Sequence, residues 1–235
     1  MQLFYNSTIT NKETTFTFDK EESKHIVKVL RKKDGDSIHI TNGLGSLFVS
    51  EITIASERKC EVKIIETQFF EPTKYNLHIV VAPTKVNDRL EWFLEKATEI
   101  GIHEITPIIC DHSERKVYKR ERADKIVQAA MKQSLQYYLP IINEPISFSE
   151  FIKKDISGEK FIAHCEETDK KSFKNKLKPQ KEIVILIGPE GDFSTKEINL
   201  AIKNHYIPVT LGNTRLRTET AALVACHTTA LINEE

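Results

Sequence analysis

The stretch Ile183-Val184-Ile185-Leu186-Ile187-Gly188-Pro189-Glu190-Gly191-Asp192-Phe193 joins an apolar strand to a loop with two glycines. Ser194 and Glu197 follow with the spacing of a capping box, which predicts that a helix begins directly after the loop. A strand, a short loop and a helix in this order are typical of a parallel α/β sheet, whose ligands bind at the carboxyl ends of strands. The stretch predicts a ligand site at Gly188–Phe193, although a tight turn between strand and helix also explains it.

A second strand, Ile207–Leu211, ends in the same way and leads through Gly212 to a closing helix. Thr218 is expected to cap this helix, and Glu219 suits its positively charged N-terminal end. Capping does not explain the two arginines of the intervening loop, Arg215 and Arg217.

The first loop is acidic, at Glu190 and Asp192, and no Walker-type Lys-Ser or Lys-Thr pair follows it. An anionic phosphate would be repelled there. The loop therefore favours a cationic or neutral ligand.

Strands and helices alternate through the chain after about residue 72, which favours a parallel sheet. Asp88 and Glu91 form an expected capping pair for one helix, which Gly101 would end. The expected elements before the first loop are the strands Leu77–Ala82, Ile105–Cys110 and Phe161–Ala163 and the helices Asp88–Ile100 and Ala123–Tyr138.

Residues 1–72 have the alternating pattern of short β-strands, with a hairpin signal at Asn42-Gly43. One helix interrupts them, with Asp19 as its expected N-cap. Its expected apolar face comprises Ile26, Val27, Val29 and Leu30. Several short strands in such a length suggest a small barrel. We therefore expect two domains, at residues 1–72 and 73–235.

The composition of the chain disfavours several classes of protein. The chain has 235 residues with 34 basic and 34 acidic side chains, so its net charge does not indicate a polyanion partner. Its four cysteines form no CxxC pair, which predicts buried thiols and no metal site. No apolar run is long enough to span a membrane, and Met1–Asn6 lacks the features of a signal peptide. We expect a cytoplasmic protein.

Basic residues nevertheless gather locally, which is compatible with binding to RNA phosphates, although solvated lysines give the same pattern. Lys85 and Arg89 follow the strand that ends at Ala82, so they lie at the same end of the sheet as the two loops. The main patch contains no acidic residue and comprises Lys24, Lys28, Arg31, Lys32 and Lys33.

The paired loops resemble those of the SPOUT class of RNA methyltransferases. The resemblance rests on Gly188-Pro189-Glu190-Gly191, followed by Leu211-Gly212 and Leu216–Ala221, and within the class it is closest to the RsmE family. That family methylates N3 of a uridine in 16S ribosomal RNA of the small ribosomal subunit. The resemblance implies a trefoil-knotted parallel α/β domain at residues 73–235 and a PUA-like β-barrel that binds RNA at residues 1–72.

The resemblance also implies that S-adenosylmethionine binds in the knot and that two copies of the chain form a homodimer. The apolar closing helix Ala221–Ile232 agrees with such pairing. By the same resemblance, Arg217 steadies the uracil or a phosphate, and Glu219 or Glu190 takes the proton from the base. The implied cofactor-binding residues are His164, Glu166, Ile187, Gly188, Pro189, Glu190, Gly191, Leu211, Gly212, Leu216, Arg217 and Thr218.

The chain departs from this family's pattern in three places, one of which is Asn213-Thr214, where Pro-Arg is common. Leu135–Tyr138 stands where many relatives have Gly-Arg-x-Arg, and Asp192 stands where glycine is common. Two other classes stay open at this point: an RNA-binding module without catalysis, and a nucleotide-binding α/β enzyme, which the acidic loop disfavours.

Overall fold

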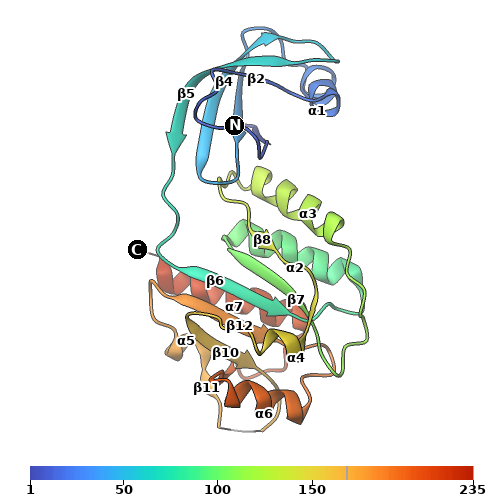
Figure 1. Cartoon of the computed structure of the whole chain (residues 1–235), viewed down its shortest axis with the longest axis vertical. Coiled ribbons are helices and arrows are strands. Elements are labelled where there is room, and N and C mark those ends of the chain that lie inside the picture. Colours follow the sequence, from blue (N-terminus) through green and yellow to red (C-terminus); the bar gives the residue numbers. More distant parts are fainter. Residues whose placement is uncertain (168, 235) are drawn as a thin grey trace. The chain divides into compact units, whose positions relative to one another are not determined.

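A computed structural model describes residues 1–167 and 169–234, and the chain forms two compact units (Figure 1). The first unit comprises Met1–Pro72 together with Met131–Leu139. The second comprises Thr73–Ala130 and the chain from Pro140 onward. The segment Met131–Leu139 thus packs with the first unit, although it lies far beyond residue 72.

A five-stranded sheet in the order β1-β3-β4-β5-β2 forms the first unit. Strand β1 (Leu3–Tyr5) runs parallel to β3 (Ser37–Thr41), and the other neighbours are antiparallel. The register shifts twice between β4 (Ser46–Ile54) and β5 (Glu61–Phe69), and such bulges bend and twist a sheet. Strand β2 (Thr15–Thr17) lies at one edge of this sheet, beside β5.

The helical segment of the first unit begins as predicted. The Asp19 carboxylate accepts a hydrogen bond from the backbone N–H of Glu22, at the start of α1 (Lys20–Lys24). The helix then continues as one π-helical turn, η1 (His25–Val29). The expected burial of Val29 is wrong, because the wider turn changes which residues face the sheet and leaves this side chain exposed.

The segment Met131–Leu139 is held to the first unit by backbone and aromatic contacts. The backbone N–H of Gly45 donates to the Tyr137 carbonyl at 2.9 Å, and the Tyr138 hydroxyl donates to the Phe70 carbonyl at 2.7 Å. The Tyr137 ring stacks on Phe70, with 4.3 Å between the centroids. Helix α3 (Arg120–Gln133) ends five residues before the expected Tyr138, because Leu135 takes a left-handed conformation with φ of 58°.

The second unit is built on an eight-stranded sheet in which every described pairing is parallel. The main path of strands runs β11-β13-β10-β12-β6-β7-β8, and β9 pairs with β7. The strands are β6 (Asn76–Val81), β7 (Glu104–Ile109), β8 (Ile141–Ile142), β9 (Ile146–Ser147), β10 (Glu159–Ala163), β11 (Lys171–Ser172), β12 (Glu182–Ile187) and β13 (Ile207–Thr210).

Helices lie on both faces of this sheet (Figure 1). On one face, Val80 and Val184 pack in a core with residues of the helices α4 and α6. On the other face, α7 contacts β6 and β12 and packs against α2. The bounds of these helices and of the short helix α5 are α2 (Asn87–Ile100), α4 (Phe148–Phe151), α5 (Phe173–Lys176), α6 (Thr195–Lys203) and α7 (Thr218–Asn233). The parallel α/β prediction for this part of the chain is confirmed, while the knot itself stays a prediction.

The ends of these helices test the capping predictions. Ser194 and Glu197 form the predicted capping box of α6, and Gly101 ends α2 in a left-handed conformation, as predicted. The expected capping by Asp88 is wrong, because α2 begins after Val86 and no side chain caps it.

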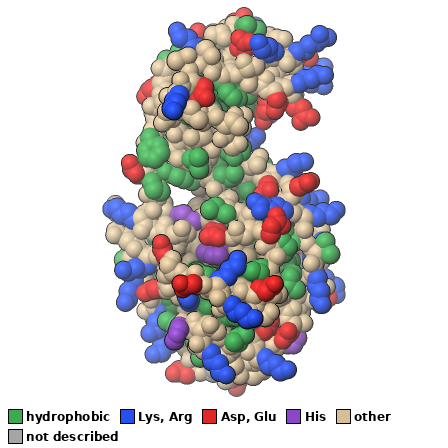
Figure 2. Space-filling model, in the orientation of Figure 1, with side chains coloured by type: hydrophobic (Ala, Val, Ile, Leu, Met, Phe, Trp, Pro, Cys, Tyr) green, Lys and Arg blue, Asp and Glu red, His purple; other side chains and the backbone are tan. Residues whose placement is uncertain are grey.

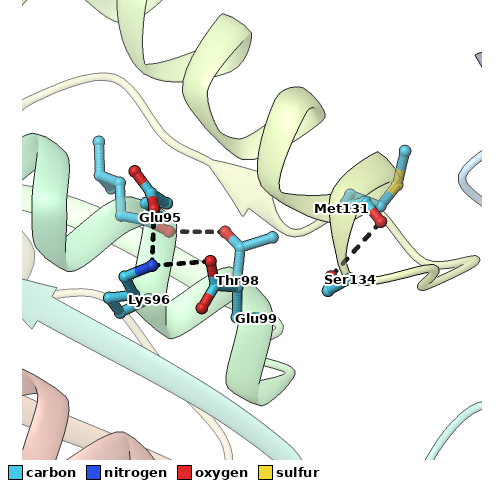
Figure 3. A network of polar contacts seen from close by, with 7 residues as sticks. Glu95, Lys96, Thr98, Glu99, Met131 and Ser134 are labelled. Carbon is cyan, nitrogen blue, oxygen red and sulfur yellow. Dashed lines mark hydrogen bonds and ion pairs between the residues drawn. The ribbon is translucent and has the colours of Figure 1, made fainter.

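Helix α2 also carries a small network of ion pairs. Lys96 Nζ lies 2.7 Å from Glu95 Oε1 and 2.9 Å from Glu99 Oε1 (Figure 3). Hydrogen bonds to Glu95 and then Glu99 raise the pKa of Lys96. Exposed ion pairs contribute little to stability, because water and salt screen them. Burial of Phe93 and Leu94 therefore holds the helix in place more strongly than this network does.

Candidate functional site

The candidate site lies where three neighbouring parallel strands end. Because β13, β10 and β12 are adjacent in the sheet, the segments that follow them meet at one edge. They surround a hollow of about 300 Å³, and a second hollow of about 90 Å³ shares part of its wall. The larger hollow is lined by Ala163, Cys165, Ile187, Gly188, Pro189, Glu190, Asp192, Arg215, Leu216, Arg217, Thr218 and Ala221.

One buried hydrogen bond joins two of these loops. The Thr218 hydroxyl donates to the Gly188 carbonyl at 3.0 Å, and Thr218 is only 5% exposed. The expected capping by Thr218 is wrong, because Arg217 is the N-cap residue of α7 and makes no side-chain capping bond. The Thr218 hydroxyl instead satisfies a carbonyl that would otherwise be buried without this partner.

The loop after β12 is also held from its other side. The ring nitrogen Nδ1 of His112 lies 3.0 Å from the Gly191 carbonyl and 3.1 Å from the Asp192 carbonyl. The Glu190 carboxylate accepts a hydrogen bond from the backbone N–H of Lys85 at 3.0 Å. A Cβ atom at Gly191 would approach His112 Cβ to 3.0 Å, so this position has little room for a side chain.

Two features of the smaller hollow point to a ligand. His164 is 7% exposed, and neither of its ring nitrogens has a hydrogen-bond partner among the described residues. Burial, followed by the positive charge of Lys170, lowers the pKa of His164 and favours the neutral ring. Gly212 has a φ of 153°, and a Cβ atom there would meet nothing within 4 Å. Unsatisfied buried nitrogens beside open space are the features that a bound polar molecule would explain.

The structure brings most of the predicted cofactor residues together. His164, Leu211 and Gly212 line the smaller hollow, and Ile187, Gly188, Pro189, Glu190, Leu216, Arg217 and Thr218 line the larger one. Gly191 and Glu166 are not in the wall of either hollow. The Glu166 carboxylate instead accepts a hydrogen bond from the Thr195 hydroxyl at 2.7 Å.

Glu219 lies apart from these wall residues. It is 7% exposed, and its Oε1 atom lies 3.8 Å from Nε of Arg89. Its second oxygen, Oε2, has no hydrogen-bond partner among the described residues. Of the two carboxylates expected to accept a proton, the structure puts Glu190, and not Glu219, in the wall of the hollow.

Sequence reasoning missed several wall residues. Ala163 and Cys165 carry no motif of their own, and only their closeness to predicted positions could have indicated them. Ala221 ends the Leu216–Ala221 motif but was not predicted as a binding residue. The expectation that all cysteines are buried is wrong for Cys165, which is exposed because it follows β10 at the edge of the sheet. Burial raises the pKa of the Cys60 thiol to about 11, as is typical of an inert core cysteine.

The predicted RNA-contacting residues differ in their exposure and in whether their side chains already have a polar partner. Lys24, Lys28, Arg31 and Lys33 are exposed, while Lys32 Nζ donates to the Ser37 carbonyl at 3.2 Å. Figure 2 shows basic and acidic side chains interspersed on the face in view.

In the second unit, Lys85 Nζ lies 2.7 Å from Glu114 Oε2. The hydrogen bond that Lys85 donates to that carboxylate raises the pKa of Lys85. Arg89 is half-buried beside Glu219. Lys85 and Arg89 are therefore already paired, whereas the exposed residues of the first unit's patch have room to meet a partner.

Across residues 1–167 and 169–234, no group of three or more metal-binding side chains is close enough to hold an ion. Within the same ranges, none of the helices has the length and apolar character needed to cross a bilayer.

Two family models match the chain over its two units, and both describe an RNA methyltransferase. A family model described as RNA methyltransferase domain matches residues 71–230, and one described as RNA methyltransferase PUA domain matches residues 18–65.

More specific relatives share one name. A protein of Buchnera aphidicola named ribosomal RNA small subunit methyltransferase E is 33% identical over 89% of this chain and 85% of its own length. The protein of that name from Bacillus subtilis is 29% identical over 90% of this chain and 88% of its own. The chain belongs to this RsmE family of RNA methyltransferases.

Solved structures agree over nearly the whole chain. A probable rRNA methyltransferase from Porphyromonas gingivalis is 36% identical and superposes with a TM-score of 0.92, covering 99% of this chain and 98% of that one. A ribosomal RNA small subunit methyltransferase E from Neisseria gonorrhoeae, bound to S-adenosylmethionine, is 25% identical with a TM-score of 0.88, covering 99% and 98% of the two chains.

Proposed function

We propose that the protein transfers a methyl group from S-adenosylmethionine to N3 of a uridine in 16S ribosomal RNA of the small subunit. The observation that carries the proposal is the hollow at the ends of β10, β12 and β13, in a chain of this family. The relative from Neisseria gonorrhoeae, whose fold this chain shares, binds that cofactor.

The residues of the hollow suit this cofactor. S-adenosylmethionine carries a positive sulfonium, an amino group and a carboxylate, and the wall offers both signs of charge. Glu190 and Asp192 come from one loop, and Arg215 and Arg217 come from another. The unpartnered ring of His164 and the open space at Gly212 would receive the remaining polar groups and the flat base. Backbone groups of the three loops complete the binding site.

When bound, the cofactor supplies a methyl group on a positively charged sulfur, which a nucleophile displaces in line. N3 of uridine carries a proton, so the protein must accept that proton or stabilise the anion. Of the two carboxylates predicted for this role, Glu190 lies in the wall of the hollow and is our candidate. The Arg217 guanidinium, exposed at the rim of the hollow, would hold the uracil oxygens or a neighbouring phosphate. Correct orientation of the two reactants supplies much of the rate.

Glu219 takes a positioning role in this scheme. Its carboxylate is buried beside Arg89, one residue after the Thr218 that joins the loops. We expect it to hold the N-terminus of α7, and thereby the loop that carries Arg217, because a carboxylate is stabilised at that end of a helix.

The first unit would supply affinity for RNA. Its exposed basic residues Lys24, Lys28, Arg31 and Lys33 carry no base-reading motif, so they suit phosphates of a preformed RNA surface. An enzyme with no net positive charge would depend on such a surface, and the assembled small subunit in the cytoplasm provides one.

The active form would be a homodimer. Helices α2 and α7 pack together, and the large apolar side chains of Trp92 and Leu231 on them are 44% and 50% exposed. Light scattering at micromolar concentration should give twice the mass of the chain, and a monomer mass would contradict this part of the proposal.

The test is methylation of assembled small subunits compared with naked 16S RNA, read by mass spectrometry of the RNA nucleosides. The parent should form N3-methyluridine, and Arg217→Ala should reduce the rate about a hundredfold or more, the scale of losing one electrostatic contact in the transition state. RNA binding without any methylation would indicate a binding module. Rates equal to the parent for Arg217→Ala would remove that residue from the site.

A further inference from the structure

Asp192 has an unfavourable backbone conformation at the edge of the hollow. Its φ is 64°, in the left-handed region that glycine adopts freely and that other residues adopt at a cost. Such strain persists only where the surrounding structure holds it, and it concentrates at ligand sites. Glycine adopts this conformation more freely than aspartate, so the contacts of the Asp192 carboxylate are of interest.

The carboxylate is held by two backbone donors. Oδ2 accepts a hydrogen bond from the N–H of Cys165 at 2.7 Å, and Oδ1 accepts one from the N–H of Phe193 at 2.9 Å. Cys165 belongs to the loop after β10, whereas Asp192 belongs to the loop after β12. The side chain thus connects two loops of the site and has a fixed direction.

The charge of this carboxylate is not neutralised by a basic side chain. Asp192 has no ion-pair partner among the described residues, although it lines the same hollow as Arg215. Glu190, the other acidic wall residue, uses one oxygen to accept a hydrogen bond from the Lys85 backbone. A fixed negative charge in a hollow favours the more positive of two otherwise identical ligands.

We propose that Asp192 makes the site prefer the charged cofactor to the spent one, an inference that rests on the proposed function. S-adenosylmethionine has a sulfonium, whereas S-adenosylhomocysteine, which remains after methyl transfer, has a neutral thioether. The two molecules share their adenosine, amino and carboxylate groups. The ratio of their affinities therefore isolates the effect of the sulfur's charge, and Asp192 would hasten release of the product.

The experiment measures both affinities by calorimetry on the full chain. Asp192→Asn removes the charge at nearly constant shape, and Asp192→Gly removes the charge and the backbone strain together. Each should reduce the preference for S-adenosylmethionine about three- to tenfold, as expected for one partly solvated charge pair. Glu167→Gln is the control, because it removes an equal charge from an exposed residue outside both hollows.

The dependence of the two affinities on ionic strength provides a second test. The preference of the parent should fall toward that of Asp192→Asn as ionic strength rises, because salt screens a partly exposed pair. If both variants bind the two molecules more weakly by the same factor, Asp192 only fastens the loops and the inference is overturned. If the parent binds neither molecule, the proposed function fails and the inference falls with it.

Discussion

The hydrogen bond between Thr218 and Gly188 gives the sharpest test of how the site is built. Thr218→Val keeps the shape of the side chain but removes the only hydroxyl that reaches the Gly188 carbonyl among the described contacts. A buried acceptor without its partner costs about 1–3 kcal/mol. With a shift of about 2–4 °C per kcal/mol for a chain of this size, a loss near 2 kcal/mol lowers the melting temperature by about 4–8 °C.

The same substitution should weaken the binding of S-adenosylhomocysteine. The lost bond joins the loop after β12 to the start of α7, and both contribute to the wall of the larger hollow. Part of the energy of this hydrogen bond stabilises the loop conformation that binds the ligand. If that part is about 1.4 kcal/mol, the affinity falls about tenfold. Titration calorimetry measures this directly, with melting followed by circular dichroism on the same samples.

Two variants serve as matched controls. Thr218→Ser keeps the hydroxyl and should retain the affinity while losing about 1 kcal/mol of stability with the methyl group. Thr229→Val removes a buried hydroxyl that donates to the Ala225 carbonyl within the same helix, and it should leave the affinity unchanged. A folded Thr218→Val protein with the parent affinity would refute the assignment of this bond to the site.

Three further outcomes are expected. Gly212→Ala should weaken cofactor binding in calorimetry, whereas Gly35→Ala, which also places a Cβ in open space at positive φ but lies in the other unit, should only cost about 1 kcal/mol of stability. Replacing Lys28 and Lys33 together by alanine should lower the salt dependence of RNA binding, by about one unit of the log–log slope per lost phosphate contact, without changing cofactor affinity. Burial lowers the pKa of His78 despite nearby Glu104, so the unfolded chain takes up the proton at a higher pH. The melting temperature should therefore fall as pH drops below about 6.5, and less steeply in His78→Gln.

The sequence correctly predicted those features of the site that depend on residues close together in the chain. The Ser194 and Glu197 box correctly placed the start of α6, because each partner lies within one turn of the other. The loops at Gly188 and Gly212 were found because glycines directly after apolar strands indicate where a parallel sheet presents its edge.

Features that depend on distant segments were not predictable in this way. Thr218 was wrongly predicted to cap the helix, because threonine is common at helix N-caps. The neighbouring sequence does not show that the Gly188 carbonyl lies within reach of its hydroxyl. The exposure of Val29 follows from one π-helical turn, and helical periodicity assumes that no such turn interrupts it. The pairing of Asp192 with Cys165 joins loops that only the strand order brings together.

The contribution of Met131–Leu139 to the first unit has a consequence for synthesis on the ribosome. The last strand of that unit, β5, ends at Phe69, but the partners Tyr137 and Tyr138 follow only after much of the second unit has been made. At about 5–20 residues per second, roughly 3–14 s pass between the synthesis of Phe69 and that of Tyr138. The nascent N-terminal portion must therefore remain soluble while incomplete, and a fragment that stops at Pro72 would represent this waiting intermediate rather than the finished unit.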